Sequence, residues 1–78
     1  MKYLTVESFV NSLPEEDLWK IIEDYEKYIR IDDEFEVPFL RQKAREFSDM
    51  YFYMDYMPKI ALYAYRHFAL KYKETQND

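Results

Sequence analysis

The feature that most constrains this chain is the segment of residues 59–73, KIALYAYRHFALKYK, because its apolar side chains nearly encircle a helix. With successive residues turned by about 100°, one broad face and both of its shoulders are apolar. Only a narrow polar strip is left, formed by Lys59, Arg66 and Lys73, which recur at intervals of seven residues. A helix of this kind has to be covered on several sides. We therefore expect it to be the central helix around which the other elements pack.

Glycine is absent from the chain of 78 residues, which contains three prolines. Glycine is the usual residue at positive φ in hairpins and in phosphate-binding loops, so both structures are disfavoured. Aromatic residues make up 21% of the sequence, enough for the dense core that a domain of this size requires. We expect an all-α fold, a small compact helical bundle of three main helices plus a short N-terminal helix. It forms a single domain over residues 1–78, with a frayed tail at residues 74–78.

Capping residues indicate where the first two helices begin. Thr5 is a candidate N-cap for a short first helix. Residues 12–15, Ser-Leu-Pro-Glu, have the pattern of a capping box, in which a serine hydroxyl and a glutamate carboxylate each bond an unpaired backbone N–H. The box predicts a second helix that runs to about Arg30.

Two prolines set the expected boundaries in the second half of the chain. Pro38 should start the third helix, after an extended connector at residues 31–37. Pro58 interrupts the backbone hydrogen bonds, so either a fourth helix begins there, capped by Asp55, or one helix over residues 38–73 is kinked. We expect two helices, because a bend lets the last helix fold back onto the others. The apolar periodicities then predict a core that contains Leu18, Ile22, Ile29, Leu40, Phe47, Tyr51, Ile60, Ala64 and Phe68.

Few residues could carry chemistry. The chain has no cysteine and one histidine, His67, which the helical pattern places at the edge of the core as a half-buried packing residue. The acids of residues 32–36 lack the central glycine of a calcium-binding loop, and no serine lies in a nucleophile motif. A bundle this small also leaves little volume for a ligand pocket, which usually measures about 300 Å³ or more. We expect no catalytic residue, no metal site, no cofactor and no enzymatic activity.

Charge is distributed unevenly along the chain. The formal net charge is −5, but residues 13–36 contain ten acids and three bases, whereas residues 59–78 contain four bases and two acids. Neither a signal peptide nor an apolar run of about 18 residues is evident, so we expect a cytoplasmic protein that does not enter a membrane. The acidic segment is the most informative compositional feature.

This acidic segment, together with aromatic residues left over from the core, predicts a surface that binds another protein. A field of one sign favours a basic partner and repels nucleic acid, and Tyr, Trp and Met are enriched in interfaces. A solvated acidic face with half-exposed aromatic residues is the competing interpretation. The candidate partner-binding residues are Glu15, Asp17, Trp19, Glu23, Asp24, Asp32, Asp33, Glu34, Glu36, Tyr53 and Tyr56.

In its general character the sequence, which is short, acidic, glycine-free and rich in tyrosine, is similar to many phage-encoded or mobile-element inhibitors of host nucleic-acid enzymes. The resemblance is one of composition. It implies an inhibitor of the anti-CRISPR or anti-restriction type, which would occlude a basic, nucleic-acid-handling host protein by nucleic-acid mimicry. It assigns no role to any individual residue.

A function of another class remains open, that of a dimeric helical regulator that binds DNA. Its candidate contacts are basic residues of the last two helices, namely Arg41, Arg45, Lys59, Arg66 and Lys73. The acidic composition argues against it, since nucleic-acid-binding domains normally carry a basic surface. Self-association is a further expectation, because residues 50–57 are apolar on more sides than one helix can cover. The expected dimer contacts are Met50, Tyr53, Met54, Tyr56 and Met57.

Overall fold

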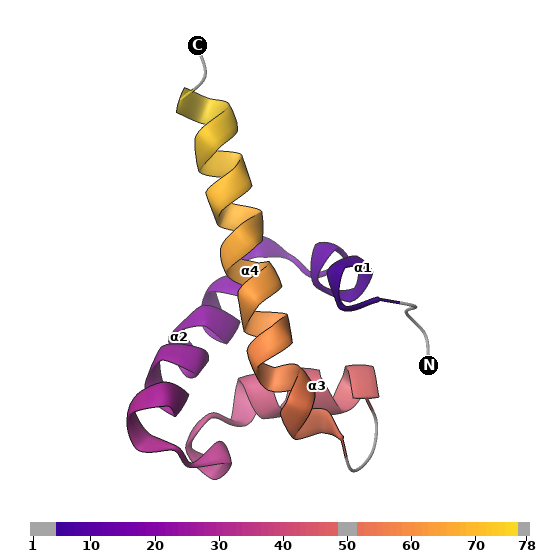
Figure 1. Cartoon of the computed structure of the whole chain (residues 1–78), viewed down its shortest axis with the longest axis vertical. Coiled ribbons are helices and arrows are strands. Elements are labelled where there is room, and N and C mark those ends of the chain that lie inside the picture. The colour runs from indigo at the N-terminus through magenta and orange to yellow at the C-terminus, as the bar shows by residue number, and fades with distance from the viewer. Residues whose placement is uncertain (1–4, 49–51, 77–78) are drawn as a thin grey trace.

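The computed structural model describes residues 5–48 and 52–76, which form four α-helices and one short 3-10 helix (Figure 1). No β-strand occurs in these two ranges. The elements in chain order are α1 (Val6–Asn11), α2 (Glu15–Ile31), η1 (Glu34–Glu36), α3 (Pro38–Ser48) and α4 (Tyr53–Gln76). The prediction of a small all-α bundle, with three main helices and a short N-terminal helix, is confirmed.

Helix α4 is the centre of the packing, since α1, α2 and α3 each contact it. Its buried side chains come from residues 57–64, in its first half. They join side chains from the other helices in one core, made of Phe9, Val10, Leu18, Ile21, Ile22, Val37, Leu40, Ala44, Phe47, Met57, Ile60, Ala61 and Ala64. Six of the nine residues predicted for the core are among them.

The outer side of α4 and its last turns are not covered, and the prediction of a helix buried on several sides is wrong there. Its last turns project beyond the other helices (Figure 1), and Leu62, Leu70 and Tyr72 are exposed. The reason is length, because α4 has 24 residues whereas α1, α2 and α3 have 6, 17 and 11. Three shorter helices cover only one side of the first half of α4.

The three remaining residues of the predicted core are placed differently. Ile29 is 63% exposed, because the last turns of α2 face the core through the larger side chains of Tyr25 and Tyr28. Phe68 is only half-buried and packs against the edge of the core. Tyr51 lies outside the described residues.

The first helix begins as predicted, but the second does not. Thr5 caps α1 through a capping box with Ser8, in which each side chain accepts a hydrogen bond from the backbone N–H of the other residue. The capping box predicted at residues 12–15 is wrong, because the Ser12 hydroxyl donates to the carbonyl of Phe9 and closes α1 instead. Helix α2 has Pro14 at its N-cap without a side-chain cap, and the three acids of its first turn compensate the helix dipole.

The connector between α2 and α3 is a tight turn, so the predicted extended connector is wrong in its centre. Asp32 adopts a left-handed conformation with φ of 58° and closes α2 by donating its backbone N–H to Tyr28. Glycine usually occupies such a position, and aspartate is one of the few residues that tolerate it. Asp33 then caps η1, and beyond η1 Val37 is fully buried while Phe35 stays exposed.

Pro38 begins α3 as predicted. The second half of the chain forms two helices and not one kinked helix, also as predicted, but Pro58 is not the boundary between them. Helix α4 begins at Tyr53 and carries Pro58 inside it, with Asp55 in its first turn rather than at its N-cap. Because Pro58 is the sixth residue of α4, its missing N–H costs only one backbone hydrogen bond close to the helix start. At the other end the helix continues to Gln76, so residues 74–76 of the expected frayed tail are helical, and residues 77 and 78 lie outside the described range.

Helix α3 receives its cap from another helix. The Asp24 carboxylate on α2 accepts a hydrogen bond of 3.0 Å from the backbone N–H of Leu40, the third residue of α3. The first turn of α3 contains no acid of its own, so Asp24 also supplies the negative charge that the N-terminal end of a helix dipole favours. This contact links α2 to α3 across the connector.

We predict that Asp24→Ala lowers the free energy of unfolding by about 1–2 kcal/mol, because the Leu40 N–H loses a charged acceptor. Urea denaturation followed by circular dichroism measures the change. Glu23→Ala is the matched control, since Glu23 is the adjacent exposed acid and makes no hydrogen bond or ion pair within the described residues. If Asp24→Ala costs no more than Glu23→Ala, the carboxylate is not a functional cap.

Candidate interaction surface

Where the start of α2 crosses the second half of α4, aromatic side chains meet at the surface. Trp19 is 52% exposed, and its ring stacks on Phe68 with the ring centroids 4.2 Å apart and the planes 27° from parallel. Tyr72, one turn beyond Phe68 on α4, is 65% exposed. These three residues line an open pocket of about 410 Å³ together with Glu15 and Lys71. We call these five residues the Trp19 surface.

Glu15 ties the two helices of the Trp19 surface together by charge. Its carboxylate accepts hydrogen bonds of 2.7 and 2.8 Å from the Lys71 ammonium and lies 2.9 Å from Nε2 of His67. The hydrogen bond from Lys71, and after it that from His67, lowers the pKa of the Glu15 carboxyl below its usual value of 4.5. The His67 ring meets Phe68 edge to face. His67 is half-buried and bonded to a single carboxylate, as expected of a residue at the edge of the core.

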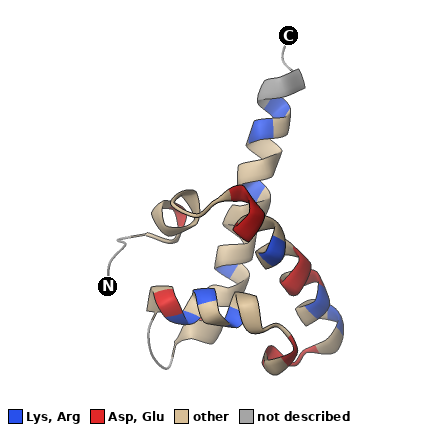
Figure 2. Cartoon of the chain, turned by 180° about the vertical axis from the view of Figure 1, so that it is seen from behind, with Lys and Arg blue, Asp and Glu red and all other residues tan. Residues whose placement is uncertain are grey.

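On the solvent side of α2, the Trp19 surface is bordered by acids. Glu16 and Glu23 lie three residues before and four residues after Trp19, and therefore on its side of the helix. Both are exposed, and neither makes a hydrogen bond or ion pair within the part of the chain that the structure describes. Figure 2 shows acids and bases alternating along α2. The outer face of this helix thus combines unpaired carboxylates with an aromatic centre.

Glu23 was among the predicted partner-binding acids and Glu16 was not; most of the other predicted acids do not join this border, because they have structural roles elsewhere. Asp24 caps α3, and Asp33 accepts a hydrogen bond of 3.0 Å from the Phe35 backbone N–H. Glu34 accepts a hydrogen bond of 2.7 Å from the Tyr53 hydroxyl. The two remaining acids of the connector are Glu36, 3.8 Å from the Lys27 ammonium, and the helix-closing Asp32. The acids predicted as one binding surface are therefore divided between the two ends of α2, with Asp17 half-buried near its start.

The apolar patch predicted for self-association is not a single exposed surface. Met57 is fully buried in the core, and Tyr56 packs edge to face on Phe47 with the ring centroids 4.9 Å apart. Tyr53 is half-buried through its bond to Glu34, and only Met54 is exposed, at 44%. Met50 lies outside the described residues. Tyr53 and Tyr56 are accordingly packing residues, and self-association itself stays a prediction.

The basic residues considered for DNA binding lie over aromatic rings of the same chain. The Arg41 guanidinium is 4.9 Å from the centre of the Phe35 ring, and Arg45 is 5.8 Å from that of Tyr53. On α4, Lys59 lies over Tyr56 and Arg66 over Tyr63. Cation–π contacts of this kind hold a cation against the protein surface without removing its charge. The role of these residues and of Lys73 in binding DNA stays a prediction.

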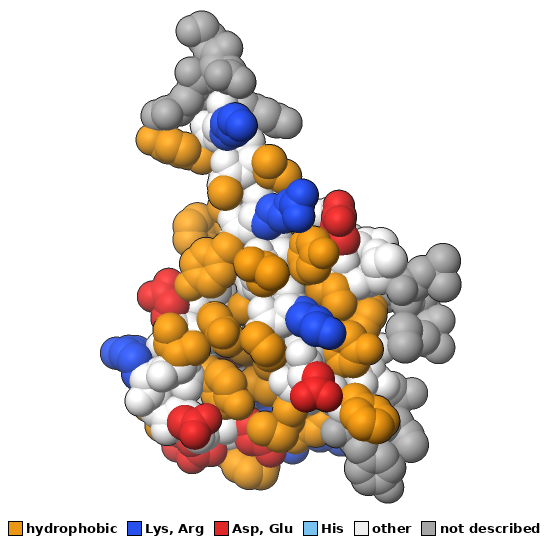
Figure 3. All heavy atoms as spheres, viewed as in Figure 1, with side chains coloured by type: hydrophobic (Ala, Val, Ile, Leu, Met, Phe, Trp, Pro, Cys, Tyr) orange, Lys and Arg blue, Asp and Glu red, His pale blue; other side chains and the backbone are white. Residues whose placement is uncertain are grey.

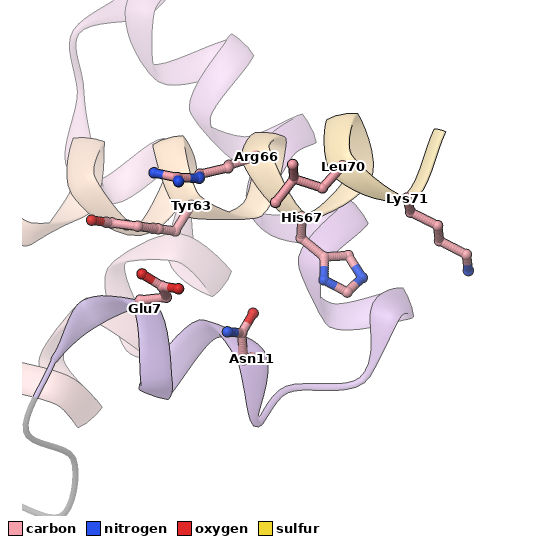
Figure 4. A pocket seen from close by; sticks show the side chains of 7 residues that line it. All are labelled: Glu7, Asn11, Tyr63, Arg66, His67, Leu70 and Lys71. Atoms are coloured by element: carbon pink, nitrogen blue, oxygen red, sulfur yellow. The ribbon is translucent and has the colours of Figure 1, made fainter. Parts of the chain in front are cut away.

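A pocket of about 390 Å³ separates α1 from the second half of α4, which is more volume than we expected in a bundle of this size (Figure 4). Glu7 and Asn11 point into it from α1, and α4 contributes the other lining residues, Tyr63, Arg66, His67, Leu70 and Lys71. The imidazole among them is bonded to Glu15. Within the described residues, no three His, Asp or Glu side chains group to hold a metal ion.

No helix in the described ranges is both long enough and apolar enough to cross a lipid bilayer. Comparisons with protein-family models, with curated proteins and with solved structures find no match for this chain.

We predict that Glu15 makes the stability of the fold depend on pH. A carboxyl whose pKa is lowered by folding contributes stability above its unfolded pKa and loses it as the pH falls through the folded value. The stability difference between the parent and Glu15→Gln should therefore be present at pH 7 and shrink below pH 4.5, the usual pKa of the group. Thermal melts of both proteins across this range measure it, with Glu16→Gln as the control. A difference that is the same at pH 3 and at pH 7 would show that the ion pair contributes nothing.

Proposed function

We propose that this chain is a small cytoplasmic protein-binding module without enzymatic activity, and that it binds a basic partner protein through the Trp19 surface. The observation that supports this is the placement of Trp19, half exposed and held flat against Phe68, between the unpaired carboxylates of Glu16 and Glu23. An aromatic centre within a polar rim is the usual arrangement of a protein interface.

Fixing the aromatic centre before binding favours affinity. Trp is the residue most enriched at binding hot spots, and it contributes a large contact area at a small cost in side-chain entropy. Here the stack on Phe68 restrains the Trp19 ring, and the bonds of Glu15 to Lys71 hold α2 and α4 together beneath it. A partner would therefore meet a surface that needs little rearrangement.

The acidic border would determine which partners approach. Residues 13–36 carry ten acids and three bases. The resulting negative field accelerates encounter with a basic protein and repels nucleic acid. We accordingly propose an inhibitor that occludes the nucleic-acid-binding groove of its partner, in line with the composition that the chain shares with phage and mobile-element inhibitors.

The test is quantitative capture from nuclease-treated cell extract by the immobilised protein. We predict that Trp19→Ala reduces recovery of the main captured basic protein at least about tenfold, the usual effect of removing a hot-spot aromatic residue. The double charge reversal Glu16→Lys with Glu23→Lys should abolish recovery, and higher salt should weaken capture by the parent. Phe52→Ala, which removes an aromatic side chain 66% exposed elsewhere, is the control for Trp19.

Glu7→Lys with Glu46→Lys is the control for the charge reversal, since it makes the same change in net charge on α1 and α3, and the pair that Glu46 forms with Lys43 within α3 contributes little to stability. Asp33 and Glu34 are unsuitable for reversal, because Asp33 accepts a hydrogen bond from the Phe35 backbone N–H and Glu34 accepts one from the Tyr53 hydroxyl of α4, so their loss would disturb the fold as well as the charge. Capture that Trp19→Ala leaves unchanged would refute the proposal. Binding of the purified protein to a DNA duplex in a gel-shift assay at physiological salt would also refute it and would favour the DNA-binding regulator.

A further inference from the structure

A second surface runs along the outer side of α4. It consists of five apolar residues, which we call the α4 stripe: Met54, Pro58, Leu62, Tyr65 and Ala69. They recur every three or four residues, which places them on one side of the helix. All five are exposed, with values of 62% for Leu62, 44% for Met54 and 39% for Tyr65. Figure 3 shows this face, with hydrophobic side chains gathered along the length of α4.

Among the described residues, no side chain of the α4 stripe packs into the core. The side chains that α4 buries, Met57, Ile60, Ala61 and Ala64, point to the other helices and leave the stripe outside the core. From Met54 to Ala69 the stripe extends over about 22 Å, the length of roughly four turns. The Tyr65 ring in its centre is held in place because its hydroxyl donates a hydrogen bond of 3.1 Å to Glu26.

Positive charge borders the α4 stripe on the side away from α2, whereas Glu26 of α2 lies at the other side, where it bonds Tyr65. Lys59, Arg66 and Lys73 are exposed and lie along one line beside it, because they are seven residues apart. Two of these cations lie over tyrosine rings of the same helix, Lys59 over Tyr56 and Arg66 over Tyr63. The first turn of α4 contributes a single acid, Asp55, to the same border.

We propose that the α4 stripe binds an amphipathic helix of a second partner protein, one whose apolar face is flanked by acidic residues. Such a helix would lay its apolar residues on Pro58, Leu62 and Tyr65 and bring its acids to the line of Lys59, Arg66 and Lys73. A second copy of this chain fits less well, because an antiparallel pair of α4 helices related by two-fold symmetry places both basic lines on the same side, where they repel. This inference goes beyond the proposed function, since it uses another face and a partner of opposite charge.

The probe is a pair of fluorescent synthetic peptides of 18 residues that carry the same leucine face, one flanked by glutamate and the other by lysine. We expect the acidic peptide to bind in a fluorescence anisotropy titration, and the basic peptide to bind at least about tenfold more weakly, because only the acidic flank complements the border of the stripe. Added salt should weaken the binding of the acidic peptide. Leu62→Glu should reduce its affinity by at least about tenfold, since an unpaired charge would be buried in the contact.

Ile29→Glu is the matched control, because Ile29 on α2 is 63% exposed, like Leu62, but lies outside the stripe. It should leave the affinity for the acidic peptide unchanged, and circular dichroism melts should show that both variants fold. Equal binding of the two peptides, or binding that Leu62→Glu does not weaken, overturns the inference. If the parent forms a dimer in sedimentation velocity and Leu62→Glu dissociates it, the stripe binds a second copy of the chain. If the parent sediments with anionic vesicles and Leu62→Glu does not, the stripe binds a membrane.

Trp19→Ala separates this inference from the proposed function. It should leave the affinity for the acidic peptide unchanged, because Trp19 is not part of the α4 stripe. If it abolishes peptide binding, the two surfaces act as one and the inference fails. If Trp19→Ala has no effect on the captured basic protein while Leu62→Glu still weakens the peptide, the proposed function fails and the inference stands.

Discussion

The structure depends on one mismatch, that between a helix of 24 residues with apolar side chains on most sides and the three shorter helices available to cover it. Burial is favourable in proportion to the apolar area removed from water, so α1, α2 and α3 gather on the first half of α4 and form the core there. Among the described residues, much of the remaining apolar area stays exposed, as at Leu62, Leu70 and Tyr72. The Trp19 surface and the α4 stripe both arise from this remainder.

The sequence predicted the helices better than their packing. Local signals such as Thr5 and Pro38 identified helix starts correctly, because a cap or a proline acts within one turn. The prediction from Ser12 was wrong because its hydroxyl can bond either the end of α1 or the start of α2, and local sequence does not decide between them. Ile29 and Phe68 misled for another reason. Periodicity shows which side of a helix is apolar, but whether that side is covered depends on the length and position of its neighbours.

For the candidate surface, the sequence identified the residue types and half of the arrangement. Trp19 was expected to bind a partner, and it is exposed between unpaired acids. Its stack on Phe68 and the bond of Glu15 to Lys71, 56 residues away, could not be predicted, because no periodicity relates residues so far apart. The acids of the connector looked like free charge, yet Asp33 and Glu34 serve the fold. Composition counts charges, but it does not show which carboxylates also make contacts within the fold.

The projection of α4 also has a consequence for local unfolding. Beyond Phe68 the helix is held by its own backbone hydrogen bonds and by the contacts of Lys71 and Tyr72, with no core side chain to anchor it. Such turns open at a much lower free energy than the core, so their amide protons should exchange with solvent long before those of residues 57–64. The exchange rate at this end of the helix therefore reports directly on whether a partner covers it, even when the partner leaves the fold unchanged.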